Sequence, residues 1–157
     1  MINPKRRTFL KKSLASGIIL SAASAGLLKP VQVLAAAWPK NAFAASDIDS
    51  ALTRLYGNSQ FSPSKAIKLK APVHAENGAA VPVTVSTTLP NVRTISVLVK
   101  ENRVPLVLNV RFFGATGYIT GRVKMSATSD VYAVVQSDGK LYGAKRMIKV
   151  TVGGCGG

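Results

Sequence analysis

The sequence predicts a mainly β protein, an antiparallel two-sheet sandwich preceded by a short helix. The chain has 157 residues, of which 47% are hydrophobic and 17% charged, a composition suited to one domain with a real core. From Ala66 onward the apolar residues recur with a period of about 2 instead of about 3.6, as in strands with one buried face. Seven short strands punctuated by turn residues favour an immunoglobulin-like sandwich.

Residues 1–37 carry the features of a cleaved export signal. Arg6-Arg7 is followed by Thr-Phe-Leu-Lys and then by an uncharged run of 16 residues, 13–28, as in twin-arginine signals. This run is short and diluted by serine and glycine, so we expect no stable membrane insertion, rather than an uncleaved anchor. We expect cleavage after residues 35–37, Ala-Ala-Ala, with the Ala-Phe-Ala of 42–44 as a second possibility, and a periplasmic location.

The mature domain, residues 38–152, is expected to begin with one helix. Ser46 is the predicted N-cap of a helix over 47–56, whose apolar residues fall on one face, and Gly57 is the predicted stop. Strands are then predicted by alternation at 67–71, 81–86, 95–99, 106–112, 118–126, 131–136 and 141–152. Asp138-Gly139 is a favourable turn for a hairpin between the last two.

Some apolar residues fall on positions expected to face outward. In the strand from 106, Leu106, Leu108, Val110 and Phe112 are predicted to form the inward row. Leu98, Val107, Val134 and Phe113 then point away from the core. Either a partner protein covers this second face, or some of the predicted registers are off by one residue.

The charged residues do not suggest a catalytic site. The first 37 residues hold six of the 21 basic residues and no acid, so the rest carries 15 basic and 6 acidic residues, a net charge of +9. That charge favours anionic ligands or acidic partners, or it only keeps the surface soluble. The scattered acids and the one histidine, His74, predict neither an enzyme, nor a metal site or other cofactor, nor a nucleic-acid interface. A structural role for His74 is favoured over a pair with Cys155.

The most informative segment is the C-terminus, residues 153–157. The last predicted strand runs directly into Gly153, Gly154, Cys155, Gly156 and Gly157, and Cys155 is the only cysteine. Glycine has no side chain and much backbone freedom, so we expect a flexible arm that presents a bare thiol. Five residues extend at most about 16–18 Å, enough to enter an active-site channel of another protein.

This arrangement predicts a covalent substrate carrier. A thiol has an unperturbed pKa of about 8.5 and nothing on the arm lowers it, so activation must come from the protein that receives it. Two alternatives remain open. The chain could be a ubiquitin-like sulfur donor that uses the terminal Gly-Gly carboxylate, or a structural interaction module that a disulfide links to a partner.

The terminal Gly-Gly-Cys-Gly-Gly, the twin-arginine signal and Glu76-Asn77-Gly78 leading into Val81-Pro82-Val83 together resemble the SoxY family of thiosulfate-oxidation carrier proteins. The terminal motif is the most specific part of this resemblance, which spans essentially the whole mature chain. It implies an immunoglobulin-like fold, a heterodimer with a SoxZ-like subunit and covalent attachment of sulfur to Cys155. The stretch from Glu76 to Gly78 is expected to be a turn between strands.

The resemblance also implies a set of enzyme partners. In that family the cytochrome pair SoxA and SoxX joins thiosulfate oxidatively to the cysteine, and SoxB hydrolyses off sulfate. SoxCD, where present, oxidises the remaining sulfane sulfur.

Overall fold

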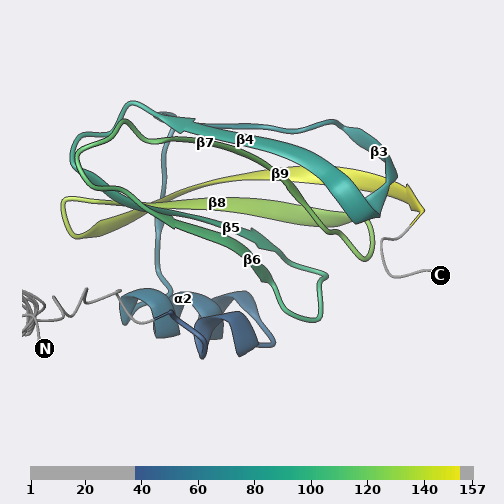
Figure 1. The fold of residues 1–157 in the computed structure, drawn as a ribbon, viewed down its shortest axis with the longest axis horizontal. Coiled ribbons are helices and arrows are strands. Elements are labelled where there is room, and N and C mark those ends of the chain that lie inside the picture. Colours follow the sequence, from purple (N-terminus) through teal and green to yellow (C-terminus); the bar gives the residue numbers. More distant parts are fainter. Residues whose placement is uncertain (1–37, 153–157) are drawn as a thin grey trace, which may run out of the picture. The chain divides into compact units, whose positions relative to one another are not determined.

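The computed structural model describes residues 38–152, so the predicted export signal and the predicted arm lie outside the described residues. Within this part, nine strands form two sheets (Figure 1). The strands are β1 (Ser62–Pro63), β2 (Ile67–Lys70), β3 (His74–Asn77), β4 (Val81–Thr87), β5 (Val92–Val99), β6 (Leu106–Arg111), β7 (Tyr118–Val123), β8 (Ser129–Ser137) and β9 (Lys140–Val152).

The larger sheet has the order β1-β9-β8-β5-β6, with β3 also paired to β9, and the smaller sheet has the order β2-β4-β7. All pairs are antiparallel except those of β1 and β3 with β9. The two sheets face each other, and the one α-helix of the described part lies on the outer side of the larger sheet (Figure 1). The predicted immunoglobulin-like β-sandwich is confirmed.

Alternating residues of both sheets form the main core. On β4 and β5 the inward residues are at most 2% exposed: Val81, Val83, Val85, Ile95, Val97 and Val99. They pack with Val131, Ala133 and Val135 of β8 and with Ile148 of β9. Each fully buried side chain of this size contributes about 1.5–3 kcal/mol relative to an exposed one, which makes this layer the principal stabilising element.

The helix, α2 (Ile48–Tyr56), follows a 3-10 turn, η1 (Ala42–Ala44). It begins one residue later than predicted, because Asp47 and not Ser46 is the N-cap. The Asp47 carboxylate accepts a hydrogen bond from the Ser50 backbone N–H at 2.8 Å, and this bond lowers the pKa of Asp47. Gly57 ends the helix as predicted, with φ at +75°. No helix of the described part is long and apolar enough to cross a membrane.

The helix covers a second core on the other face of the larger sheet. Ala51 and Leu52 of α2 are fully buried against Leu98, Val134 and two further leucines of that sheet. Leu98 and Val134 do face away from the core between the sheets, as predicted, but neither a partner nor an error of register explains them. The chain's own helix buries them, and β5 is buried on both faces as a result.

The predicted inward row of β6 is confirmed for Leu108, Val110 and Phe112, which pack against the core between the sheets, and is wrong only at Leu106. The register shifts between Val97 and Leu98, so Leu108 lies opposite Val97 while Leu106 lies opposite Leu98. Val107 is the extra residue of this bulge, and it packs against the core between the sheets, whereas Leu106 packs under the helix. A shift in register, not a partner, explains the position of Val107.

The connections follow local chemistry. The β8–β9 hairpin turns through Asp138 and Gly139, which have φ values of 49° and 75°, as a type I′ turn requires, so this prediction is confirmed. All seven predicted strands exist.

The prediction of a turn from Glu76 to Gly78 is wrong in part, because Glu76 and Asn77 belong to β3 and only Gly78 begins a 3-10 turn, η2 (Gly78–Ala80).

A substitution at Gly143 tests how closely β9 packs against Phe61. A Cβ atom at Gly143 would collide with the ring of Phe61, whereas a Cβ at Gly121, on β7, would meet nothing within 4 Å. We expect Gly143→Ala to lower the free energy of unfolding by about 1–3 kcal/mol through overpacking. The matched Gly121→Ala variant is expected to change it little. Urea unfolding of both variants measures the difference, and equal midpoints would contradict the contact with Phe61.

Candidate functional site

The predicted site is the C-terminal arm, and the structure describes the strand from which it departs. Strand β9 carries the chain to Val152, immediately before Gly153. Cys155 and the four glycines around it lie outside the described residues, as do Arg6 and Arg7 of the predicted export signal. What the structure brings together is therefore the base of the arm.

The last residues of β9 are held from both sides. Strand β3 runs parallel to β9, with His74 opposite Lys149, Ala75 opposite Val150, and Asn77 opposite Val152. On this side the Lys149 N–H donates to the Val73 carbonyl at 2.9 Å. On the other side the Val150 N–H donates to Oγ1 of Thr128 at 3.0 Å. Thr128 is the residue immediately before β8 in the sequence. Residues 149–152 are thus part of the sheet, and the arm starts from an ordered strand.

Strand β3 was missed by the sequence reasoning. Its four residues, His-Ala-Glu-Asn, include no β-branched or aromatic residue, and only Ala75 is buried. The strand pairs with β9, which lies about half the chain away in the sequence, and the pattern of neighbouring residues does not predict such a pairing. A weak signal was present, because Glu76 and Asn77 of this strand belong to the family-like Glu76-Asn77-Gly78 motif.

His74 is exposed on β3, opposite Lys149. Within the described residues its ring makes no hydrogen bond or ion pair, so no carboxylate orients it as the base of a Cys-His pair requires. Four of the six acids have other partners: Asp47 caps α2, Asp138 accepts from Asn91, and Glu101 and Asp130 lie 3.8 Å from Lys100 and Lys145. Among the described residues, no three His, Cys, Asp or Glu side chains gather as a metal site would need.

Exposed cations outnumber acids at the arm end of the sandwich. Two loops meet η2 there, since the Asn102 side chain donates to the Lys124 carbonyl at 2.7 Å and the Met125 N–H donates to the Gly78 carbonyl at 2.7 Å. These loops and the adjoining strands carry Lys100, Arg103, Lys124 and Lys149 against Glu76, Glu101 and the half-buried Asp130. A positive surface of this kind speeds encounter with acidic proteins.

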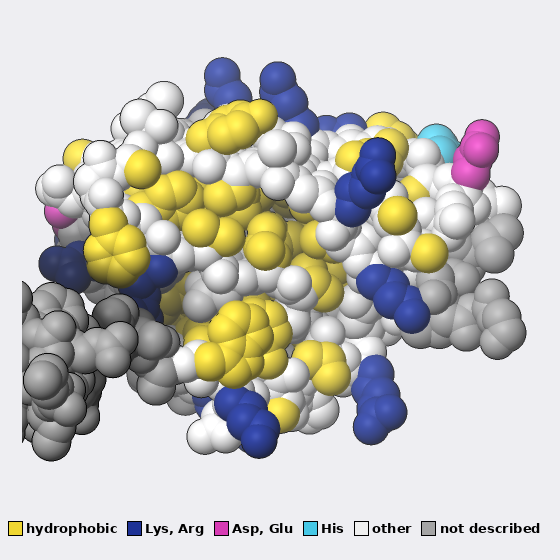
Figure 2. All heavy atoms as spheres, in the orientation of Figure 1, with side chains coloured by type: hydrophobic (Ala, Val, Ile, Leu, Met, Phe, Trp, Pro, Cys, Tyr) yellow, Lys and Arg dark blue, Asp and Glu magenta, His cyan; other side chains and the backbone are white. Residues whose placement is uncertain are grey.

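One side of the sandwich leaves its core partly open. Strands β6 and β7 are edge strands of the two sheets, and the core residues along β6 are only half buried. We call this surface the open edge; it consists of Val107, Leu108, Val110 and Phe112. Figure 2 shows hydrophobic side chains gathered across this face. Phe113, next to it in sequence, is 85% exposed, as predicted.

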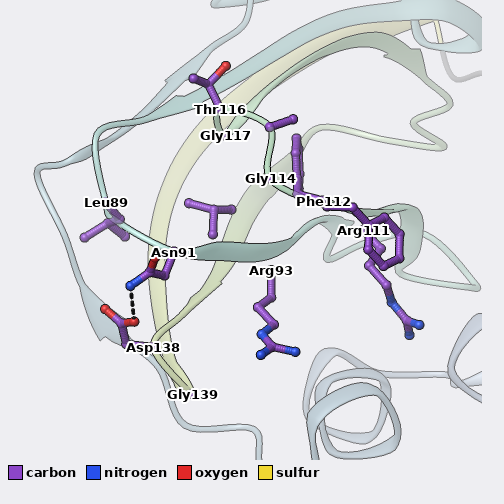
Figure 3. A pocket seen from close by; sticks show the side chains of 13 residues that line it. Leu89, Asn91, Arg93, Arg111, Phe112, Gly114, Thr116, Gly117, Asp138 and Gly139 are labelled. Atoms are coloured by element: carbon purple, nitrogen blue, oxygen red, sulfur yellow. Dashed lines mark hydrogen bonds between the residues drawn. The ribbon is translucent and has the colours of Figure 1, made fainter.

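A hollow of about 850 Å³ lies beside the β8–β9 turn (Figure 3). It is lined by residues of the loops 89–93, 111–117 and 138–139. The last of these is the turn at the start of β9, and 13 residues of strand at about 3.3 Å each separate it from Val152 by about 40 Å. The five-residue arm spans less than half of that distance, so Cys155 cannot reach this hollow in its own chain.

Comparison with known proteins gives the same class of fold and a specific family. The family described as sulfur oxidation protein SoxY matches residues 52–155, a range that ends at Cys155. The structure is similar to the sulfur carrier protein SoxY from Chlorobium limicola f thiosulfatophilum, with a TM-score of 0.62, 39% identity, and coverage of 68% of this chain and 98% of that one. A superoxide reductase (neelaredoxin) from Ignicoccus hospitalis is also similar, with a TM-score of 0.48, 24% identity, and coverage of 54% and 80%. No curated protein matches.

The fold and the two SoxY matches define a β-sandwich protein of sulfur oxidation. The chain belongs to the SoxY family, whose Chlorobium limicola relative is a sulfur carrier protein. The resemblance seen in the sequence is therefore confirmed.

The hydrogen bond between Val150 and Thr128 tests how firmly the base of the arm is held. Thr128→Val keeps the shape of the side chain but removes the acceptor, so the local opening free energy at Val150 should fall by about 1 kcal/mol. We expect the Val150 amide to exchange with solvent about fivefold faster in native-state hydrogen exchange.

The control is Thr120→Val on β7, whose hydroxyl is 3.1 Å from the Thr84 hydroxyl and, in the part of the chain that the structure describes, has no other partner. Exchange at Val150 should be unchanged in that variant. If Thr128→Val also left it unchanged, the base of β9 would be held by β3 alone.

Proposed function

We propose that the protein is a periplasmic carrier that holds thiosulfate-derived sulfur intermediates on Cys155 and presents them to separate sulfur-oxidation enzymes. The observation that carries this proposal is a single cysteine within Gly-Gly-Cys-Gly-Gly, directly after a strand fixed on both sides. Family membership through Cys155 and the carrier role of the Chlorobium relative support it. The folded body then serves for docking, and the arm delivers the sulfur.

The proposed reactions on Cys155 balance when partner enzymes supply the electron acceptor and the hydrolytic activity. A SoxA/SoxX-like cytochrome pair accepts two electrons as the Cys155 thiolate and the outer sulfur of thiosulfate form a disulfide bond. A SoxB-like enzyme then adds water to the terminal sulfonate, which leaves as sulfate, while a persulfide remains on Cys155. A SoxCD-like enzyme, where present, oxidises that persulfide sulfur.

Export by the twin-arginine route is part of the same proposal. Cleavage before Trp38 would leave Ala42 and Ala45 in place, and both are 1% exposed in the core under the helix. Cleavage after residue 44 would remove Ala42 from this core. The packing therefore supports the earlier cleavage site, and with it a mature chain that starts at Trp38.

Measurement of the intact protein mass tests whether Cys155 is the attachment residue. Protein isolated from cells grown on thiosulfate should carry adducts with the masses of sulfur and thiosulfate groups, because the thiol is the only nucleophilic sulfur of its kind in the chain. Cys155→Ser should carry none of them. Identical adducts on both proteins would refute attachment at Cys155.

A second variant separates the alternatives. Deletion of Gly156-Gly157 should leave some adduct on a cysteine carrier but none on a donor that uses the terminal carboxylate. Non-reducing electrophoresis addresses the third possibility, since a structural disulfide would appear as a permanent link to one protein without a pool of small adducts.

We also propose a heterodimer with a SoxZ-like subunit through a mainly hydrophobic interface at the open edge. Half-buried core residues on an edge strand, together with the exposed Phe113, form an apolar surface of the kind that protein interfaces use. This surface replaces the face around Leu98 and Val134, which the helix occupies.

The interface is tested with Val110→Lys. The aliphatic stem of lysine can cover the open edge and keep its charge in water, so the isolated domain should stay folded. Burial of that charge against a partner should weaken binding at least tenfold, about 1.4 kcal/mol, in calorimetric titration with the SoxZ-like subunit. Ala144→Lys, half buried on β9 near the opposite edge of the same sheet, is the matched control. Equal affinities for both variants would exclude the open edge.

A further inference from the structure

A second hollow, of about 310 Å³, lies beside the C-terminal turn of α2, where β5 and β6 meet the helix. Its wall includes the side chains of Arg93 on β5 and of Asn109 and Arg111 on β6. Residues two apart on a strand share a face, so Asn109 and Arg111 project to the same side. Among the described residues that line this hollow there is no carboxylate.

A chain of hydrogen bonds under the helix fixes the orientation of the Asn109 amide. Ser96 Oγ donates to Asn109 Oδ1 at 3.0 Å, and Thr94 Oγ1 donates to the Tyr56 hydroxyl at 3.0 Å. Because each hydroxyl has one proton, the Tyr56 hydroxyl must donate to Ser96 Oγ, which lies 2.6 Å away. The carbonyl oxygen of Asn109 is thereby used as an acceptor, and its Nδ2 group remains as a donor.

Among residues 38–152, no acidic side chain neutralises the two arginines. Within the described residues, neither guanidinium makes an ion pair or a hydrogen bond. They come from neighbouring strands, since Thr94 lies opposite Arg111 and the Phe112 N–H donates to the Arg93 carbonyl. Figure 3 shows both side chains extending to the same side of the sheet. The C-terminus of α2 contributes about half a negative charge nearby, which two full positive charges exceed.

We propose that Arg93, Arg111 and the Nδ2 group of Asn109 form a binding site for a tetrahedral sulfur oxyanion, such as sulfate or thiosulfate, held without a covalent bond. Guanidinium groups bind such oxyanions through paired charge-assisted hydrogen bonds, and the amide adds a third donor. The hollow has room for an anion of this size. Since Arg93 and Arg111 also line the large hollow beyond the reach of Cys155, this site is separate from the carrier arm.

The test uses sulfate as the probe and the Cys155→Ser variant as the protein, so that its result does not depend on the carrier chemistry. Sodium sulfate is titrated against sodium chloride at constant ionic strength, while the side-chain N–H signals of Asn109, Arg93 and Arg111 are followed by NMR. We expect a saturable shift of all three signals. Thiosulfate in the same protein should give the same response.

Three variants identify the site. Arg93→Gln and Arg111→Gln should each weaken sulfate binding at least tenfold. Asn109→Asp keeps the acceptor for Ser96 but replaces the donor with a negative charge, so it should abolish saturable binding while the domain stays folded. Lys68→Gln, an exposed cation on β2, is the control and should have no effect.

Two results would overturn the proposal. One is a sulfate response that does not saturate or that Lys68→Gln reduces as much as the arginine variants do, since that would be general screening of a basic protein. The other is equal affinity for acetate, which would show that the arginines bind carboxylates without preference for a tetrahedral dianion.

Discussion

The pairing of β9 is the constraint on which the rest of the structure depends. This one strand of 13 residues pairs with β8 along most of its length, with β1 near its start and with β3 at its end. Its Ile148 is fully buried in the main core, and Leu141 reaches the core under the helix. Because β9 belongs to both cores and ends at Val152, its register determines where the folded body stops and where the arm begins.

The larger sheet works as the middle of three layers. On β5, Ile95 and Val97 face the smaller sheet, while Ser96 and Leu98 face α2. The helix side is not purely apolar, since Tyr56 is held by Ser96 and Thr94, and burial raises the pKa of its hydroxyl. All polar atoms of this cluster are satisfied, so it fixes the position of the helix without leaving an unpaired buried group.

Much of this could be predicted from residues near one another in sequence. The alternation of valines on β4, the Asp138-Gly139 turn and the Gly57 stop are local signals, and each appears in the structure where it was expected. The failures were non-local. The residues near Leu98 in the sequence do not indicate that a helix about 40 residues earlier packs over it. Strand β3 is likewise defined by its pairing with β9 and not by its own residues. The bulge at Val107 exchanges the faces of Leu106 and Val107, while from Leu108 onward the register is the one that alternation predicts.

The proposed attachment site rests on composition more than on fold, because a lone cysteine between glycines needs no tertiary contact to be recognised. The structure adds the ordered base of that arm and a body with separate surfaces. The most direct measurement of the central claim is sulfate release from thiosulfate by the reconstituted partner enzymes, with wild-type carrier or with Cys155→Ser. Release is expected with the wild-type protein and none above background with the serine variant, whose oxygen cannot form the disulfide bond. Undiminished release with the serine variant would contradict that claim.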